Sequence, residues 1–172
     1  MNTKMNTIQL YTLSLREAKS VLIALAFIVG NIILPQLCHL VPQGGLILLP
    51  IYFFTLVGAY KYGWQVGLFT AIASPIINSM LFGMPAPAAM PVILIKSVLL
   101  ALSAGLMAKH THKVTLWSLI AVVLSYQIFG GMAEWAIKGT IQAPLQDFKL
   151  GLPGLILQVV GGYMVIRYLL KK

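Results

Sequence analysis

The chain has 172 residues, of which 59% are hydrophobic and 9% are charged. Soluble domains carry about 25% charged residues, so this composition indicates a protein that lies in a lipid bilayer, and the length leaves no room for a second, soluble domain. We assign the net charge of +9 to basic loops that set membrane topology rather than to nucleic-acid binding. Cys38 is the single cysteine, which excludes a disulfide within the chain and a cysteine-based metal site.

Six apolar stretches follow one another along the chain, separated by short polar or Pro- and Gly-rich segments. They cover approximately residues 17–38, 46–60, 64–82, 88–108, 114–138 and 151–170. A membrane crossing needs roughly 20 apolar residues, so we interpret each stretch as a spanning helix. The first stretch lacks a small-residue cleavage site, and we expect an uncleaved helix there rather than a signal peptide. The sequence therefore predicts an all-α integral membrane protein, a single membrane domain over residues 1–172 with six transmembrane helices.

The basic residues are distributed unevenly between the two membrane faces that this arrangement defines. With six crossings both termini lie on one face, and nine Lys and Arg residues fall on that face against two, Lys138 and Lys149, on the other. The nine are Lys4, Arg16, Lys19, Lys61, Lys109, Lys113, Arg167, Lys171 and Lys172. Cytoplasmic loops are enriched in Lys and Arg, so we predict that both termini are cytoplasmic. The loops at residues 39–45 and 83–90, and the polar loop expected over 139–150, then face outward.

Lys96 is the one basic residue within a predicted spanning helix at membrane depth. A charged side chain there costs between roughly 3 and 15 kcal/mol, so it is expected to face the bundle interior and to have a partner. At a rise of about 1.5 Å per residue, Lys96 lies about 9 Å and Glu134 about 6 Å below the outer ends of their helices. Two readings stay open: Lys96 lies in the wall of a cavity open to the outside, or it pairs with Glu134 as a purely structural feature.

Further polar residues fall in the same outer half of the predicted bundle. Polar groups in lipid need partners and should point inward together. With Lys96 and Glu134, the candidate substrate-binding residues are Gln158, Asn78, Trp135, Asn31 and His39. Single Asn and Gln side chains also serve simply to bond neighbouring helices. Trp135 suits either a pocket rim or the outer interface, and His39 is a loop histidine that could touch a ligand.

Small residues recur at four-residue spacing on the first predicted helix, as Ser20 with Ala24 and Ala26 with Gly30. Such spacing puts small side chains on one face and lets another helix approach closely. These four residues are therefore candidate positions for docking a partner subunit.

Residue patterns typical of catalysis are missing from the sequence. There is no HExxH, no GxSxG and no Gly-rich phosphate-binding loop. His110 and His112 flank Thr111 in a basic turn, where we favour a solvated turn over a metal site. We expect that the chain is not itself an enzyme and uses neither a metal nor a cofactor.

The region from residue 46 to residue 87, LILLPIYFFTLVGAYKYGWQVGLFTAIASPIINSMLFGMPAP, has a recognisable organisation. An apolar helix enters the turn Tyr60-Lys61-Tyr62-Gly63, a Gly- and Ala-rich helix contains Ser74-Pro75, and an outer turn follows at Gly83-Met84-Pro85. In this organisation, its size and its six predicted spans, the chain resembles the substrate-binding S components of energy-coupling factor (ECF) transporters, which are bacterial vitamin importers. It departs from them at Ser20, where an Ala-x-x-x-Ala motif is usual, and at Lys96, near which many relatives carry an acidic or polar residue.

The resemblance implies a protein of the bacterial plasma (inner) membrane that binds one vitamin tightly from the outside. The predicted helices 88–108, 114–138 and 151–170 would build the pocket, with the loop at residues 39–45 as a lid. The loaded subunit would dock through its first helix to a membrane coupling subunit driven by two cytoplasmic ATPases. It would then topple in the membrane and release the vitamin inside.

The charge of Lys96 bears on the substrate. A lysine beneath an outward-facing pocket favours an anionic ligand, whose charge offsets the cost of burying the ammonium group. Carboxylate vitamins such as pantothenate, lipoate, biotin or a folate are therefore preferred. If Glu134 already neutralises Lys96, a neutral thiamin or pyrimidine precursor is the alternative. A self-sufficient small carrier or channel is a further alternative, and it would need a polar path through the inner leaflet.

The charge distribution generates a test of topology. A reporter fused after Lys172 should be active only inside the cell, because nine basic residues against two place the C-terminus in the cytoplasm. Parallel fusions to alkaline phosphatase and to a green fluorescent protein would measure this, each acting as the control for the other. Phosphatase activity outside the cytoplasm would contradict the six-span arrangement.

Overall fold

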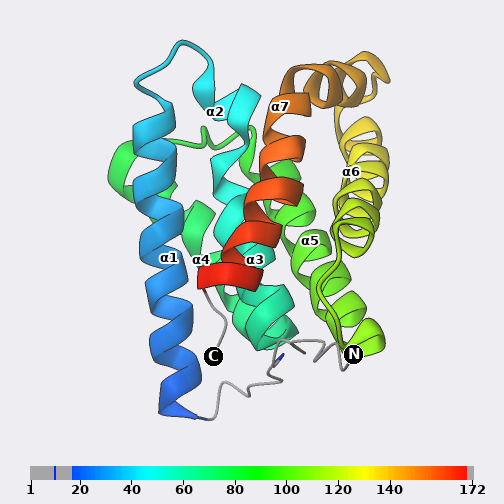
Figure 1. The fold of residues 1–172 in the computed structure, drawn as a ribbon. Coiled ribbons are helices and arrows are strands. Elements are labelled where there is room, and N and C mark those ends of the chain that lie inside the picture. Colours follow the sequence, from blue (N-terminus) through cyan, green and yellow to red (C-terminus); the bar gives the residue numbers. More distant parts are fainter. Residues whose placement is uncertain (1–9, 11–16, 170–172) are drawn as a thin grey trace, which may run out of the picture.

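The computed structural model describes residue 10 and residues 17–169, and over these residues it is helical with no strand. The elements, in chain order, are α1 (Ala18–Cys38), α2 (Gly44–Leu48), the 3-10 turn η1 (Pro50–Tyr52), α3 (Phe53–Tyr62), α4 (Trp64–Phe82), α5 (Met90–Thr111), α6 (Leu116–Lys138), α7 (Gln142–Met164) and the π-helical turn η2 (Val165–Leu169). Figure 1 shows the long helices side by side in one bundle, with α1 at one flank and α6 at the other.

Five described helices are long and apolar enough to cross a membrane: α1, α4, α5, α6, and α7 together with η2. Large apolar side chains cover their outer faces. On α1 they include Leu22, Leu25, Val29, Ile33 and Leu37, which are three or four residues apart. An exposed apolar surface of this extent is unfavourable in water and suits lipid. The all-helical prediction is confirmed, and the arrangement fits a multi-pass membrane protein.

The segment predicted as one helix over residues 46–60 is instead divided into α2, η1 and α3. Leu49, between α2 and η1, has a left-handed backbone with φ 48° and ψ 46°. Pro50 follows it, and proline disfavours the right-handed helical conformation in the residue before it and lacks an N–H of its own. The break leaves α3 with 10 residues, or about 15 Å of helix, which is half of a membrane crossing.

The last helix begins nine residues earlier than predicted, at Gln142 rather than at Gly151. Residues 142–150 contain the good helix formers Gln, Ala, Leu and Lys, and Pro144 lies in the first turn, where proline is tolerated. Figure 1 shows this first part of α7 crossing the end of α6 before the helix turns down along the bundle. Pro153 lies inside α7, and an internal proline is a usual cause of such a bend.

Helices α3, α4 and α5 approach one another closely at two glycines. A Cβ atom on Gly67 would lie 2.2 Å from Ala59 Cβ, and one on Gly105 would lie 2.5 Å from Trp64 Cβ. Neither position has space for a larger side chain unless the helices separate. Small residues at such crossings allow the close backbone packing that holds membrane helices together.

A network of neutral hydrogen bonds around Asn31 fastens α1 to α3 and α4. Asn31 is fully buried, and its Nδ2 donates to Thr55 Oγ1 at 3.1 Å and to Ser74 Oγ at 3.4 Å. Its Oδ1 accepts from the backbone N–H of Phe54 at 3.1 Å. The carbonyl oxygen of Asn31 accepts from Asn78 Nδ2 at 2.8 Å. Every polar atom of the Asn31 side chain is therefore used within the bundle.

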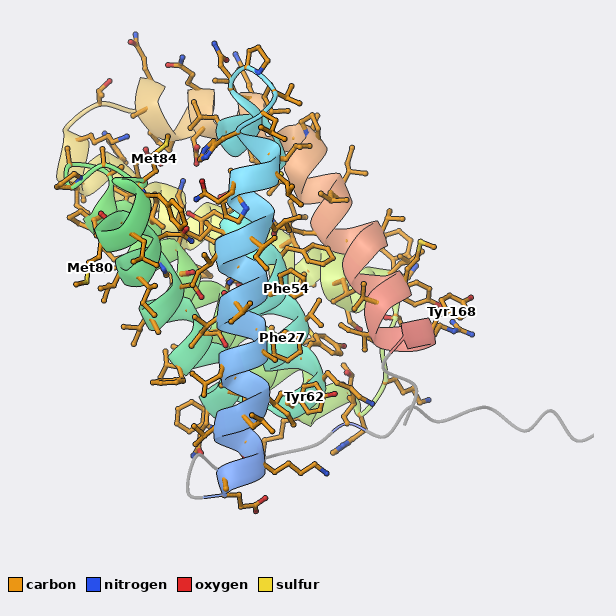
Figure 2. All side chains as sticks on the ribbon, turned by 90° about the vertical axis from the view of Figure 1, so that its left-hand side faces the viewer. Phe27, Phe54, Tyr62, Met80, Met84 and Tyr168 are labelled. Atoms are coloured by element: carbon orange, nitrogen blue, oxygen red, sulfur yellow. The ribbon has the colours of Figure 1, made fainter. Side chains whose placement is uncertain are left out.

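Aromatic rings extend the same contact along α1. Figure 2 shows Phe27, Phe54 and Tyr62 close together beside this helix. The ring centroid of Phe27 lies 6.0 Å from that of Phe54 and 5.7 Å from that of Tyr62. Aromatic pairs at this separation contribute about 0.5–1.5 kcal/mol beyond the area they bury.

Replacement of Asn31 should destabilise the bundle. Asn31→Ala removes the acceptor of the Phe54 N–H and leaves that group unpaired in the interior, which costs about 1–3 kcal/mol. Gln36→Ala is the matched control, because the Gln36 side chain makes one hydrogen bond of 3.4 Å among the described residues, to Asn78 Oδ1, and is only partly buried. Thermal unfolding of the purified variants in detergent would measure both. Equal melting temperatures for the two variants would show that the Asn31 network does not hold α1 in place.

Candidate functional site

Four charged side chains meet where α5 and α7 begin and α6 ends. Lys96 Nζ donates a hydrogen bond to Glu134 Oε2 at 2.7 Å and also pairs with Asp147. Lys138 Nζ donates to the other oxygen of the same carboxylate, Glu134 Oε1, at 2.6 Å. We call this cluster the ionic centre; its members are Lys96, Glu134, Lys138 and Asp147. Its two positive and two negative charges make it neutral as a whole.

The ionic centre has a deeply buried pair and a more accessible pair. The side chains of Lys96 and Glu134 are each 3% exposed, whereas that of Asp147 is 25% and that of Lys138 is 44% exposed. Taking an ion out of water costs several kcal/mol, and this cost is offset only where partners satisfy the charge. Lys96 meets this requirement with two carboxylates from two different helices.

Gly130 makes the passage for the Lys96 side chain. A Cβ atom on Gly130 would lie 2.5 Å from Lys96 Cγ, so any larger residue would displace the lysine stem. Glu134 is four residues further along α6, which puts it on the same helix face one turn closer to the end of the helix. The stem of Lys96 therefore crosses α6 at the glycine, and its ammonium group reaches the carboxylate one turn away.

A neutral polar pair lies deeper in the bundle. Tyr126 and Gln158 are both fully buried, and the Tyr126 hydroxyl donates to Gln158 Oε1 at 3.1 Å. Gln158 Nε2 has no hydrogen-bond partner in the described structure, so a buried donor is left to be satisfied. The Tyr52 ring, from η1, lies 5.5 Å from the Tyr126 ring between centroids.

A cavity of about 430 Å³ lies beside the loops at the same end of the bundle. Its volume falls within the range of about 300–1,000 Å³ that is usual for small-molecule sites. The walls are mainly apolar and include Pro35, Ile51 and Ile93, with polar groups from His39, Gln43 and Asn78. No member of the ionic centre is among the residues that line it.

The structure distributes the seven predicted substrate-binding residues over several places. Lys96 and Glu134 meet in the ionic centre, and Gln158 lies deeper on α7. His39 and Asn78 line the cavity, where Asn78 also accepts a hydrogen bond from Gln36.

The other two predicted residues lie elsewhere. All polar side-chain atoms of Asn31 are hydrogen-bonded in the contacts between α1, α3 and α4. Trp135 is 50% exposed and lines a separate hollow of about 290 Å³ between α6 and the first part of α7.

Asp147 and Lys138 belong to the ionic centre but were not among the predicted site residues. Asp147 was placed in a loop, so the helix that carries it over Lys96 was not anticipated. A signal was present in the composition, because Asp147 is one of only three acidic residues in the chain and follows Glu134 by 13 residues. Lys138 follows Glu134 at the four-residue spacing of a helical ion pair.

The four residues predicted to dock a partner do not share one accessible face. Ser20 and Ala24 are fully buried, on the face of α1 that packs against the rest of the bundle, so a partner could reach them only if the bundle opened. Gly30 is half-buried, and a Cβ atom there would lie 2.8 Å from the Phe54 ring. Ala26 is exposed and remains available on the outer face of α1.

The two histidines at the end of α5, His110 and His112, are both exposed. Within residue 10 and residues 17–169, no three His, Cys, Asp or Glu side chains lie close enough together to hold a metal ion. Searches of protein-family models, of curated proteins and of solved structures found no match to this chain.

Lys96 should matter far more to stability than Lys138, although both pair with Glu134. Lys96→Met removes one partner from a buried ion pair and should cost about 3–5 kcal/mol, whereas the half-exposed Lys138→Met should cost about 0–1 kcal/mol. The two changes are matched in chemistry and differ in burial. Thermal unfolding in detergent would measure them, and equal losses would show that Lys96 is solvated rather than buried among its partners.

Proposed function

We propose that this chain is the substrate-binding membrane subunit of an ATP-driven importer of the ECF type, in the plasma membrane of a bacterium. The observation that carries the proposal is the asymmetry of the bundle. The ionic centre and the 430 Å³ cavity both lie at the end where α5 begins and α6 ends. A buried ionic cluster and a cavity at the same membrane face suit capture of a small molecule from that side.

The proposal includes six crossings with both termini in the cytoplasm. The five long helices account for five crossings, and α2, η1 and α3 together supply the sixth. Figure 1 supports this count, because α1 begins and η2 ends at the same end of the bundle. Half-length helices are tolerated at membrane depth where other helices cover them, and most of α3 is buried within the bundle.

Two close contacts at the opposite end of the bundle favour a subunit that needs partners over a self-sufficient carrier. Tyr60 is fully buried there, and its hydroxyl donates to the carbonyl oxygen of Lys113 at 2.7 Å. Gly105 packs directly on Trp64 at this end, which leaves no room between α4 and α5. Release to the inside would therefore require a rearrangement, and coupling to ATP hydrolysis in partner subunits would supply its energy.

The surface proposed to meet the coupling subunit is the outer face of α1 around Ala26. This side chain is small and exposed, so a second helix can approach closely there. The neighbouring Leu22 and Val29 are exposed as well and widen the apolar face. The proposed docking surface thus lies on the exposed face of α1, whereas Ser20 and Ala24 lie on its buried face.

Identification of the bound molecule tests the function. The full chain, purified in detergent from bacterial cells, should carry one small molecule, which mass spectrometry of the denatured sample would identify. Cells should accumulate that molecule only when the chain is expressed together with its coupling subunit and ATPases. Uptake by the chain alone in ATP-depleted vesicles would identify a self-sufficient carrier, and a purified chain that binds no small molecule would contradict the proposal.

Two alanine variants serve as the matched pair in this experiment. Ala26→Trp adds bulk to the proposed docking face, and Ala121→Trp adds the same bulk to an exposed position on α6. Ala26→Trp should abolish uptake and leave ligand binding unchanged, whereas Ala121→Trp should preserve both. Equal uptake by the two variants would remove α1 as the docking surface.

A further inference from the structure

The neutrality of the ionic centre depends on Asp147. Both oxygens of Glu134 are already used, Oε2 by Lys96 and Oε1 by Lys138. Without Asp147 the centre would hold two ammonium groups and a single carboxylate, a net charge of +1. Glu134 is therefore shared between two ammonium groups, and Asp147 gives Lys96 a second carboxylate partner.

Of the two carboxylates that pair with Lys96, Asp147 is the more accessible and the easier to displace. Its side chain is 25% exposed, against 3% for Glu134, and it lies on the first part of α7, residues 142–150, which Figure 1 shows crossing the end of α6. Gly139, with φ 69°, precedes this part, and Pro153 follows it. Among the described residues, no other side chain of 142–150 makes a hydrogen bond or ion pair to the rest of the bundle. Asp147 is therefore the polar contact of this part of α7 with the bundle, and its other contacts with α6 are apolar, such as Pro144 beside Gly131.

We propose that a carboxylate of the ligand replaces Asp147 on Lys96, which makes the substrate a monocarboxylic acid. The inference rests on the proposed function and identifies the chemical group that its site recognises. One ammonium–carboxylate hydrogen bond is exchanged for another, no covalent bond changes, and the ionic centre stays neutral. Asp147 moves outward with residues 142–150 and regains water.

The charges of the ionic centre distinguish a carboxylate ligand from a neutral one. A neutral ligand that displaced Asp147 would leave the buried Lys96 ammonium group with Glu134 alone, a carboxylate that Lys138 already shares, and losing a partner from a buried charge is unfavourable. Deeper in the bundle, the unpaired Gln158 Nε2 is a donor for an acceptor at the far end of the ligand. Tyr126, which holds Gln158, lies eight residues before Glu134 on α6, or about 12 Å along the helix. An extended acid with a distal carbonyl or hydroxyl fits these two points.

A carboxylate without further contacts cannot displace Asp147 from the native protein. Asp147 is tethered to the chain, and a short tether corresponds to an effective concentration in the millimolar range or above. A simple anion such as acetate should therefore bind Lys96 only after the Asp147 carboxylate has been removed. This difference allows a test with acetate as the probe.

The experiment measures thermal unfolding of the full chain in detergent against increasing sodium acetate. For Asp147→Ala, acetate should occupy the vacated place on Lys96 and raise the melting temperature by about 2–4 °C. Native protein should not respond, and neither should the double variant Lys96→Met with Asp147→Ala. Matched sodium chloride and acetamide serve as controls for ionic strength and for a neutral molecule of the same shape.

Three results would overturn the inference: no acetate response in Asp147→Ala, an equal response to acetamide, or an equal response in the double variant. If Asp147→Ala does not fold, Asp147→Asn keeps the side-chain size and makes the same change of charge, and it should show a smaller rise with the same controls. Rescue by acetate without ATP-dependent uptake would overturn the proposed function alone. Normal uptake without rescue would overturn only the carboxylate exchange.

Discussion

The burial of one ammonium group, that of Lys96, constrains half of the molecule. The charge lies among apolar helices, where no water can solvate it, so carboxylates must come to it from elsewhere in the chain. Glu134 comes from α6, where Gly130 one turn earlier leaves room for the lysine stem. Asp147 comes from α7, whose first part crosses the end of α6 and brings the carboxylate within reach. The positions of α5, α6 and the start of α7 are thus tied to a single charge.

The other half of the bundle is held by different forces. Helices α1, α3 and α4 meet through the neutral hydrogen bonds of Asn31, through tilted pairs of aromatic rings and through glycine contacts. Such contacts contain no charge that a ligand could replace, and they are satisfied within the bundle. This half therefore suits the role of a fixed scaffold. The ionic half contains the groups whose partners can be exchanged.

The break at Leu49 and Pro50 connects the two halves. It ends α2 and starts η1, which turns Tyr52 toward Tyr126 on one side while Ile51 lines the cavity on the other. A continuous helix over residues 46–60 would not present these neighbouring residues in the same way. Residues next to the break thus contribute both to the cavity wall and to the packing around Tyr126.

The sequence by itself determined that the chain is helical and lies in a membrane, that Lys96 needs a partner, and that Glu134 is within reach. These conclusions follow from composition, from the lengths of apolar stretches and from the cost of a buried charge, which are all local properties. Only the tertiary structure decided that Asp147 completes the ionic centre, that Asn31 is used up inside the bundle, and that Ser20 and Ala24 face inward. The physical reason is that a helix in lipid is apolar on every face. Hydrophobic periodicity then does not distinguish the side that meets lipid from the side that meets another helix, and the pairing of helix faces is set only when they pack.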